Sequence, residues 1–162
     1  MIIVSQYTLE EDKDGYYHVR CCEIRVCPVC GQIVFVIGTR KRLVILDTGE
    51  KQTLIIRRLR CKGCRVIHHE LPDIIVPFKR HCADTVEKVI CGDDGDVCCE
   101  GRTIRRLKEW WVGCLLYFES ILASLREKYG VMFSLHPAPR EMIRAVVNAN
   151  LWVHTRSASL SG

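Results

Sequence analysis

Long apolar runs are missing from this chain of 162 residues. No stretch approaches the ~18 consecutive apolar residues of a membrane-spanning helix, so we expect no such span. The first residues also lack the basic start, the long apolar middle and the small-residue cleavage site of a signal peptide. The sequence therefore predicts a cytoplasmic protein.

Cysteine, in contrast, is abundant, with eleven in the chain. Because the cytosol keeps thiols reduced, we expect metal binding rather than a disulfide framework. Cys27 and Cys30 form one Cys-x-x-Cys pair, and Cys61 and Cys64 form a second. Each pair offers two thiolates from one tight turn, which predicts a closed four-cysteine Zn²⁺ site of structural type. The alternatives are a redox dithiol or two unrelated turns.

The segment between the two pairs is predicted to form strands. A β-branched run at 32–38 and an apolar run at 43–46 precede turn-forming residues at 47–50, and a third run at 52–60 leads directly into the second pair. This pattern predicts an antiparallel zinc ribbon, in which the metal replaces the core that so small a sheet cannot build alone. Prolines at 72 and 77 then favour an extended linker.

Helical periodicity follows the linker. Apolar positions 83, 86, 89 and 90 predict a first helix that starts near residue 79 and ends at Gly92. A regular apolar seam from Ile104 to Leu125 predicts either one helix that ends at Gly130 or two helices that meet near Gly113. A short last helix is predicted from residue 139 to about 148, with proline in its first turn.

Together these patterns predict an α+β chain of two domains. An N-terminal antiparallel zinc ribbon would occupy residues 1–77, and a mainly helical domain would occupy residues 78–162. Residues 79–113 have the outline of a helix-turn-helix, in which the second helix would place its first exposed residues in the major groove.

The net charge of +5 is unevenly distributed. One basic group lies between residues 20 and 65, with eleven arginines and lysines against three acids, and a second lies at 101–108, where no acid occurs. Arginine suits bidentate contacts with phosphate or guanine, although solvated strand and helix faces would have the same composition. The predicted nucleic-acid-binding residues are Arg40, Lys41, Arg42, Arg57, Arg58, Arg60, Lys62, Arg65, Lys79, Arg80, Arg102, Arg105, Arg106 and Lys108.

Two other groups of residues have weaker metal-binding patterns. His68, His69 and Asp73 would suit a metal-dependent nuclease, but adjacent residues on an extended segment point to opposite faces, so we favour structural or surface roles. A second metal site remains an alternative. Its ligands would come from Cys91, Cys98 or Cys99 together with His81 or Cys82.

Several motifs resemble known families. Cys-Pro-Val-Cys-Gly at 27–31, Arg-Leu-Arg-Cys-Lys-Gly-Cys at 58–64 and Thr-Ile-Arg-Arg-Leu at 103–107 resemble the N-terminal DNA-binding region of bacterial insertion-sequence transposases. The run at 57–73 and the tail at 152–157 are similar to a family of small bacterial zinc-ribbon and helix-turn-helix proteins of undefined function, often encoded near mobile elements. The resemblance implies target binding.

A transposase also needs three spaced carboxylates that bind Mg²⁺. The acids that follow Glu100 are Glu109, Glu119, Glu127 and Glu141, and three of them lie in or near one helix. We therefore assign no catalytic residue and expect no enzyme activity.

The sequence as a whole predicts a zinc-stabilised accessory protein of a transposon or other mobile element. It would bind double-stranded DNA at the nucleoid, recruit a transposase or recombinase, and dimerise through its C-terminal helices. One alternative is a protein-docking adaptor that uses the apolar seam. Another is an RNA-binding module, which we favour less because exposed aromatic platforms are lacking.

Overall fold

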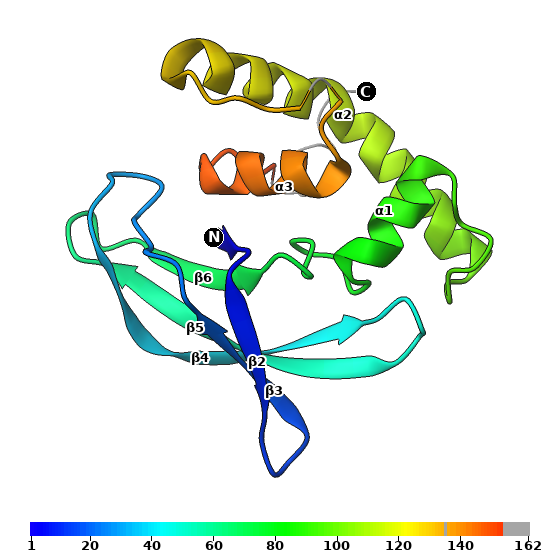
Figure 1. Ribbon diagram of the computed structural model, residues 1–162, viewed down its shortest axis with the longest axis horizontal. Coiled ribbons are helices and arrows are strands. Elements are labelled where there is room, and N and C mark those ends of the chain that lie inside the picture. The colour runs from blue at the N-terminus through cyan, green and yellow to red at the C-terminus, as the bar shows by residue number, and fades with distance from the viewer. Residues whose placement is uncertain (135, 154–162) are drawn as a thin grey trace.

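The computed structural model describes residues 1–134 and 136–153, which form a curled sheet of six strands and three helices (Figure 1). The strands are β1 (Ile2–Val4), β2 (Tyr7–Glu11), β3 (Tyr16–Cys21), β4 (Val34–Ile45), β5 (Lys51–Cys61) and β6 (Ile67–Pro72). The helices are α1 (Ala83–Cys91), α2 (Gly101–Tyr129) and α3 (Pro139–Asn148).

Strand β5 is the centre of the sheet. One of its edges pairs with β4 along nearly its whole length, and its other edge pairs with β3 in the first half and with β6 in the second half. The β4–β5 and β5–β6 pairs are antiparallel, whereas β3–β5 and β1–β6 are parallel. The sheet is therefore mixed, and the N-terminal residues extend it on two sides.

The β4–β5 hairpin confirms the turn predicted at 47–50. The N–H of Leu46 donates to the C=O of Glu50 at 2.8 Å, and Gly49 has a φ of 86°, a left-handed conformation that glycine adopts without strain. The two strands predicted at 32–38 and 43–46 are one strand, with a bulge between Val36 and Gly38. Residues 40–42, between the two predicted strands, continue the ladder with β5.

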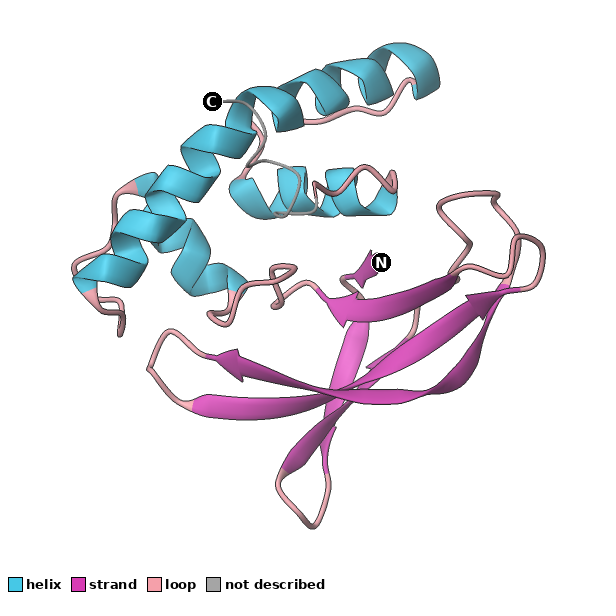
Figure 2. Cartoon of the chain, turned by 180° about the vertical axis from the view of Figure 1, so that it is seen from behind, coloured by secondary structure: helices cyan, strands magenta, loops and turns pink. Residues whose placement is uncertain are grey.

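The three helices cover one face of the sheet, and α3 lies between α2 and the sheet (Figure 2). The apolar seam of α2 buries Leu107, Trp111 and Phe118, as its spacing predicts. These residues share one core with Leu54 and Ile56 of β5. The main core thus draws its side chains from both sides of residue 77.

The predicted fold class is therefore wrong in its arrangement. The chain is built around a curled mixed sheet packed against helices, and not as an antiparallel ribbon followed by a mainly helical domain. Residues 67–72, predicted as an extended linker, form β6 and pair with both β5 and β1. The correction has a physical cause: apolar residues on this face of the sheet bury themselves against the helices, so the metal does not replace the core.

The predicted helix-turn-helix is also corrected. Residues 92–100 separate α1 from α2, which is longer than the turn of three to four residues in that motif. α2 continues through Gly113 as one helix of 29 residues and ends at Gly130 in a left-handed conformation. α3 begins at Pro139, as predicted.

None of the helices in the described residues is long and apolar enough to cross a membrane. The tail at 152–157, which contributed to the family resemblance, lies outside the described residues from position 154 onward.

Candidate metal centre and basic surface

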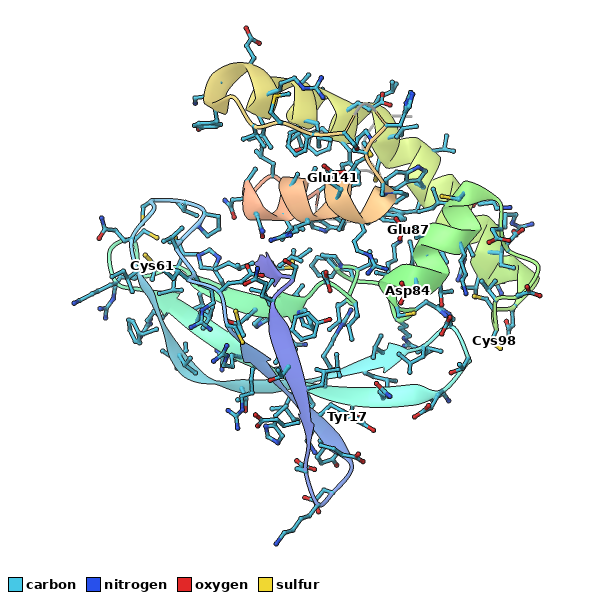
Figure 3. All side chains as sticks on the ribbon, in the orientation of Figure 1. Tyr17, Cys61, Asp84, Glu87, Cys98 and Glu141 are labelled. Carbon is cyan, nitrogen blue, oxygen red and sulfur yellow. The ribbon has the colours of Figure 1, made fainter. Side chains whose placement is uncertain are left out.

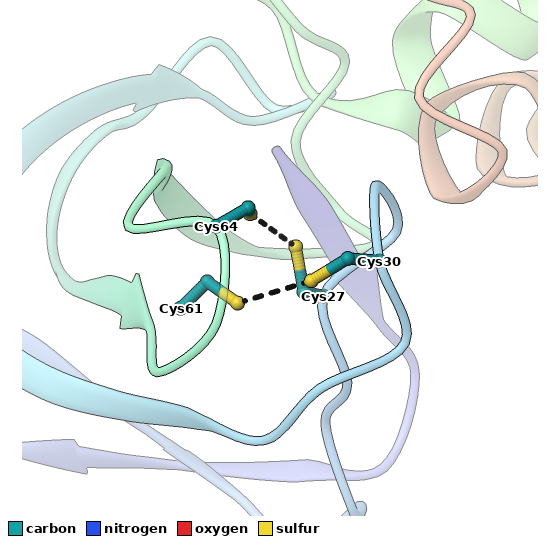
Figure 4. Close-up of side chains that lie close together, drawn as sticks. All are labelled: Cys27, Cys30, Cys61 and Cys64. Atoms are coloured by element: carbon teal, nitrogen blue, oxygen red, sulfur yellow. Dashed lines mark hydrogen bonds between the residues drawn. The ribbon is translucent and has the colours of Figure 1, made fainter.

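The two Cys-x-x-Cys pairs meet at one end of the sheet, as their spacing predicts. Cys27 and Cys30 come from the loop before β4, and Cys61 and Cys64 come from the end of β5 and the turn after it. The Sγ atoms of Cys27 and Cys64 lie 3.5 Å apart, and those of Cys30 and Cys61 lie 3.4 Å apart (Figure 4). All four sulfur atoms lie within 4.8 Å of one another.

The two turns repeat one backbone geometry. In the first, the N–H of Cys27 donates to the C=O of Gln32 at 2.8 Å, and in the second the N–H of Cys61 donates to the C=O of Val66 at 3.0 Å. The residue after each second cysteine is left-handed, with φ of 71° at Gly31 and 65° at Arg65. This conformation brings the two thiols of each pair to the same side of their turn.

Backbone groups of the turns stabilise a thiolate before any metal is considered. The N–H groups of Gln32 and Cys64 lower the pKa of the Cys30 thiol to about 6. The N–H of Val66 favours the thiolate of Cys64, but burial and the neighbouring sulfur atoms outweigh it and raise the pKa of Cys64 to about 12. One thiol therefore ionises readily, and a second keeps its proton until a cation displaces it.

Four thiolates suit a soft tetrahedral ion. A Zn–S bond of ~2.3 Å gives an edge of ~3.8 Å between sulfur atoms, and the two measured separations fall slightly below this value. Small shifts of the sulfur atoms would therefore let the cluster take a zinc-sized ion, and it is compatible with a metal site.

His68 contacts the cysteine cluster from the buried side of the site, a role that sequence reasoning missed. Its side chain is buried on β6, and its Nε2 lies 3.3 Å from Sγ of Cys27. An N–H donated from this ring would stabilise the thiolate, as groups around metal sites commonly do. A small apolar cluster that includes Val4, Val34 and Leu59 closes the inner side of the site.

The other cysteines form no comparable group among the described residues. Cys61 and Cys98 lie at opposite ends of the sheet (Figure 3). Sγ of Cys99 lies 3.7 Å from Nδ1 of His81. Among the described residues, no third ligand lies close enough to these two atoms to complete a second metal site.

The suggested nuclease group does not converge on one site. His68 contacts Cys27, and His69 lies half-buried in a hollow on the other face of β6. Asp73 accepts a hydrogen bond from the Tyr7 hydroxyl at 3.1 Å. Both histidines border this hollow, but the two histidines and Asp73 form no common ligand group among the described residues.

The predicted nucleic-acid-binding residues divide into a group that pairs with other side chains of the fold and a group that lies on a basic surface. Arg57 faces away from the helices, and its Nε donates to Oε1 of the buried Glu70 carboxylate at 2.8 Å. Its Nη2 lies 2.7 Å from the same oxygen, as an ion pair. Arg25 pairs with the same carboxylate. Sequence reasoning missed this cluster, because no local pattern connects positions 25, 57 and 70.

Other members of the predicted set also have partners in the fold. The Nζ of Lys41 lies 3.7 Å from the Tyr16 ring centre. Lys108 pairs with Asp94 at 2.7 Å, and Arg105 lies 3.7 Å from Glu109. These side chains are less available to a phosphate backbone than the sequence suggests.

The remaining basic residues gather on the helix-covered face of the sheet and continue onto α2. Arg58 and Arg60 lie on this face, since Arg58 pairs with His69 in the β5–β6 ladder.

Two hollows lie along this basic surface. The first, of about 540 Å³, is lined in part by Arg40 and Arg42. The second, of about 750 Å³, adjoins the first, as shown by Phe78, which lines both. The basic residues of the second hollow are Lys51, Lys79, Arg80 and Arg106. Lys62 and Arg65 lie exposed at the second cysteine turn, and Arg102 lies exposed at the start of α2.

Comparison with known protein families matches residues 27–107 to the family described as a domain of unknown function (DUF6431). The match covers half of the chain and includes all four clustered cysteines. The chain belongs to this family. No curated protein and no solved structure matches it.

Proposed function

We propose that this member of the DUF6431 family is a zinc-stabilised protein that binds double-stranded DNA and performs no catalytic step itself. Zn²⁺ is the proposed ion because four thiolates form its preferred closed tetrahedral site. Such a site has no open coordination position, so the ion would hold the loop before β4 against the end of β5. The basic side chains, and not the metal ion, would then contact the DNA.

The observation that carries the proposal is the continuity of the basic surface. Its arginines and lysines come from β4, β5, the 79–80 segment and α2, yet they line two adjoining hollows. Among the described residues that line these hollows, only one is acidic, namely Glu100. A surface with several cations and so few anions favours a polyanion such as a nucleic acid.

The first turns of α2 strengthen the argument. Arg102 and Arg106 lie near the helix N-terminus, and the first turn contains no acidic residue. Cations in this position are unfavourable because they meet the positive end of the helix dipole. A bound phosphate would relieve this repulsion, since it interacts favourably with both the helix end and the guanidinium groups.

The biological setting is proposed from the motif resemblance alone. Because the cysteine motifs resemble those of insertion-sequence transposases, the ends of a mobile element are the first duplexes to test. A transposase or recombinase would be the partner recruited there.

Charge reversal on α2 tests the DNA-binding proposal. The variant Arg102→Glu/Arg106→Glu is compared with Lys13→Glu/Arg20→Glu, which changes the net charge equally but lies in the β2–β3 hairpin, away from the helices (Figure 1). Binding to closed circular duplex DNA is measured by fluorescence anisotropy between about 50 and about 200 mM salt. We expect the α2 variant to bind more weakly, with a salt slope reduced by about one for each phosphate that it no longer neutralises.

Equal binding by the α2 variant and the parent would reject this surface as the DNA-binding surface. Equally weakened binding in both variants would show only a general effect of net charge. Tighter binding to RNA than to duplex DNA would replace the proposed target.

A protein-docking role is the second candidate, and a different surface favours it. A groove of about 740 Å³ runs between α2, α3 and the segment that joins them, and Ile121, Phe133 and Leu151 help to line it. On α2, Val112 and Leu116 are 72% and 80% exposed. A partner helix or a second copy of the chain would cover such apolar area, and its binding would depend weakly on salt.

A further inference from the structure

The first hollow differs from the rest of the basic surface because it combines cationic and apolar walls. One wall is formed by Arg40, Arg42 and His69, and the opposite wall includes Val147 and Trp152 near the end of α3. The β4–β5 register places Arg40 opposite Ile56 and Arg42 opposite Leu54, so both arginines extend from the core face of the sheet. Its volume of about 540 Å³ is that of an ordinary small-ligand site.

The cations of the hollow lack a counter-charge within the described part of the chain. None of the described residues that line it is acidic. Nη2 of Arg42 donates to the C=O of Lys79 at 2.8 Å, which holds the side chain in place without neutralising it. Burial and the Arg40 guanidinium lower the pKa of Arg42, and the same two causes, together with other nearby cations, lower the pKa of His69.

On the opposite face of the sheet, partly buried arginines have a carboxylate of the same chain as their counter-charge. There, Arg25 and Arg57 share the buried carboxylate of Glu70. Partly buried charges are normally paired, because an unpaired one loses hydration without compensation. Arg42 is partly buried beside a second arginine, and its charge is left for a ligand to balance.

We propose that this hollow binds a nucleotide, with Arg40, Arg42 and His69 around the phosphate and the apolar wall against the base. Arginine provides paired N–H donors for phosphate oxygens, and a half-buried imidazole adds one more. Val147 and Trp152 supply an apolar surface on the other side of the hollow. The ligand is either a free nucleotide or the phosphorylated end of a nucleic-acid strand, because both present the same chemical groups.

The site shares Arg40 and Arg42 with the proposed DNA-binding surface but does not depend on duplex binding. A free nucleotide would occupy it even if the α2 surface contacted no DNA. Circular duplex DNA has no strand end, so its binding tests the basic surface without filling the proposed nucleotide site.

Calorimetric titration of the zinc-loaded full chain tests the inference, with AMP, adenosine and inorganic phosphate as probes. We expect AMP to bind more tightly than either of the other two. Arg40→Ala and His69→Gln should each weaken AMP binding about tenfold, the value of a hydrogen bond to a charged group. Arg106→Ala, in the adjoining hollow, is the matched control and should leave AMP binding unchanged.

Absence of AMP binding, or AMP binding that neither pocket variant weakens, would overturn the inference. The source is then assigned with a short single strand that carries either a 5′-phosphate or a 5′-hydroxyl. A preference for the phosphorylated strand over AMP identifies a strand end, and a preference for AMP identifies a free nucleotide. Duplex binding that disappears only in the Arg102→Glu/Arg106→Glu variant would separate the two proposals.

Discussion

Glu70 shows how a single residue can connect distant parts of the chain. Its side chain has no exposed surface, and its carboxylate receives donors from Arg25 in the loop before β4 and from Arg57 in β5. The arginine side chains keep only 21% and 18% of their surface exposed. The carboxylate therefore fixes the cysteine-bearing loop against β6.

Replacement of Glu70 by alanine should strongly destabilise the protein. Two partly buried guanidinium groups would lose their shared counter-charge, and breaking a buried pair in this way costs about 3 kcal/mol or more in the free energy of unfolding. Urea unfolding of the zinc-loaded protein measures the effect. Glu109→Ala is the control, since Glu109 contacts an exposed arginine at 3.7 Å and should change stability far less. Equal stability of the two variants would contradict the role of Glu70.

At the scale of elements, α2 is the longest helix and contains one glycine in its interior. Gly113 is exposed, and a Cβ added there would have no atom within 4 Å. The seam from Ile104 to Leu125 predicted the helix but left open whether this glycine would interrupt it. Packing of Trp111 and Phe118 into the same core keeps the helix continuous.

Gly113→Ala should therefore stabilise the protein by about 1 kcal/mol, the difference in helix propensity between the two residues. Gly92→Ala is the informative counterpart, because Gly92 closes α1 with a φ of 86° and an alanine there should destabilise by about 1 kcal/mol. Thermal unfolding followed by circular dichroism measures both. A lower stability of Gly113→Ala would show that the helix bends at this position.

At the scale of the whole molecule, the metal centre and the helical core stabilise different ends of the sheet. The four cysteines adjoin a small apolar cluster, while the helices cover the main core. Removal of the metal should thus weaken the cysteine-bearing end first. The adjacent Glu70 cluster and β6 would transmit this weakening to the sheet.

Zinc retention should fall as the pH falls. Zinc binds thiolates, so each proton that it displaces reduces the apparent affinity up to about tenfold for each unit by which the pH decreases. Cys30, with a pKa of about 6, is already ionised at neutral pH, whereas Cys64, with a pKa of about 12, must release its proton to the solvent. Affinity is therefore highest at alkaline pH and lowest at acidic pH.

Competition with a chromophoric chelator at pH ~8 and pH ~6 measures this dependence. We expect zinc release to be greater at the lower pH and to be accompanied by a lower Tm. Lys13→Ala, at an exposed position in the turn between β2 and β3, should leave both quantities unchanged. Equal zinc retention at the two pH values would show that protonated thiols do not compete with the metal.

The sequence by itself determined the local features of this protein. The spacing of Cys27, Cys30, Cys61 and Cys64 predicted the metal cluster, since tight turns with fixed spacing place thiols close together whatever surrounds them. The turn at 47–50, the helix stop at Gly130 and the start of α3 at Pro139 were equally readable, because each depends on the backbone preferences of a few residues.

Only the tertiary structure decided how these parts combine. The parallel pairing of β1 with β6 and of β3 with β5, the packing of the helices on the sheet, and the burial of His68 and Glu70 all join residues far apart in the chain. The same holds for the hollow between Arg40, His69 and Trp152. Local periodicity cannot specify such contacts, because they arise from the global burial of apolar surface and from the charges that this burial brings together.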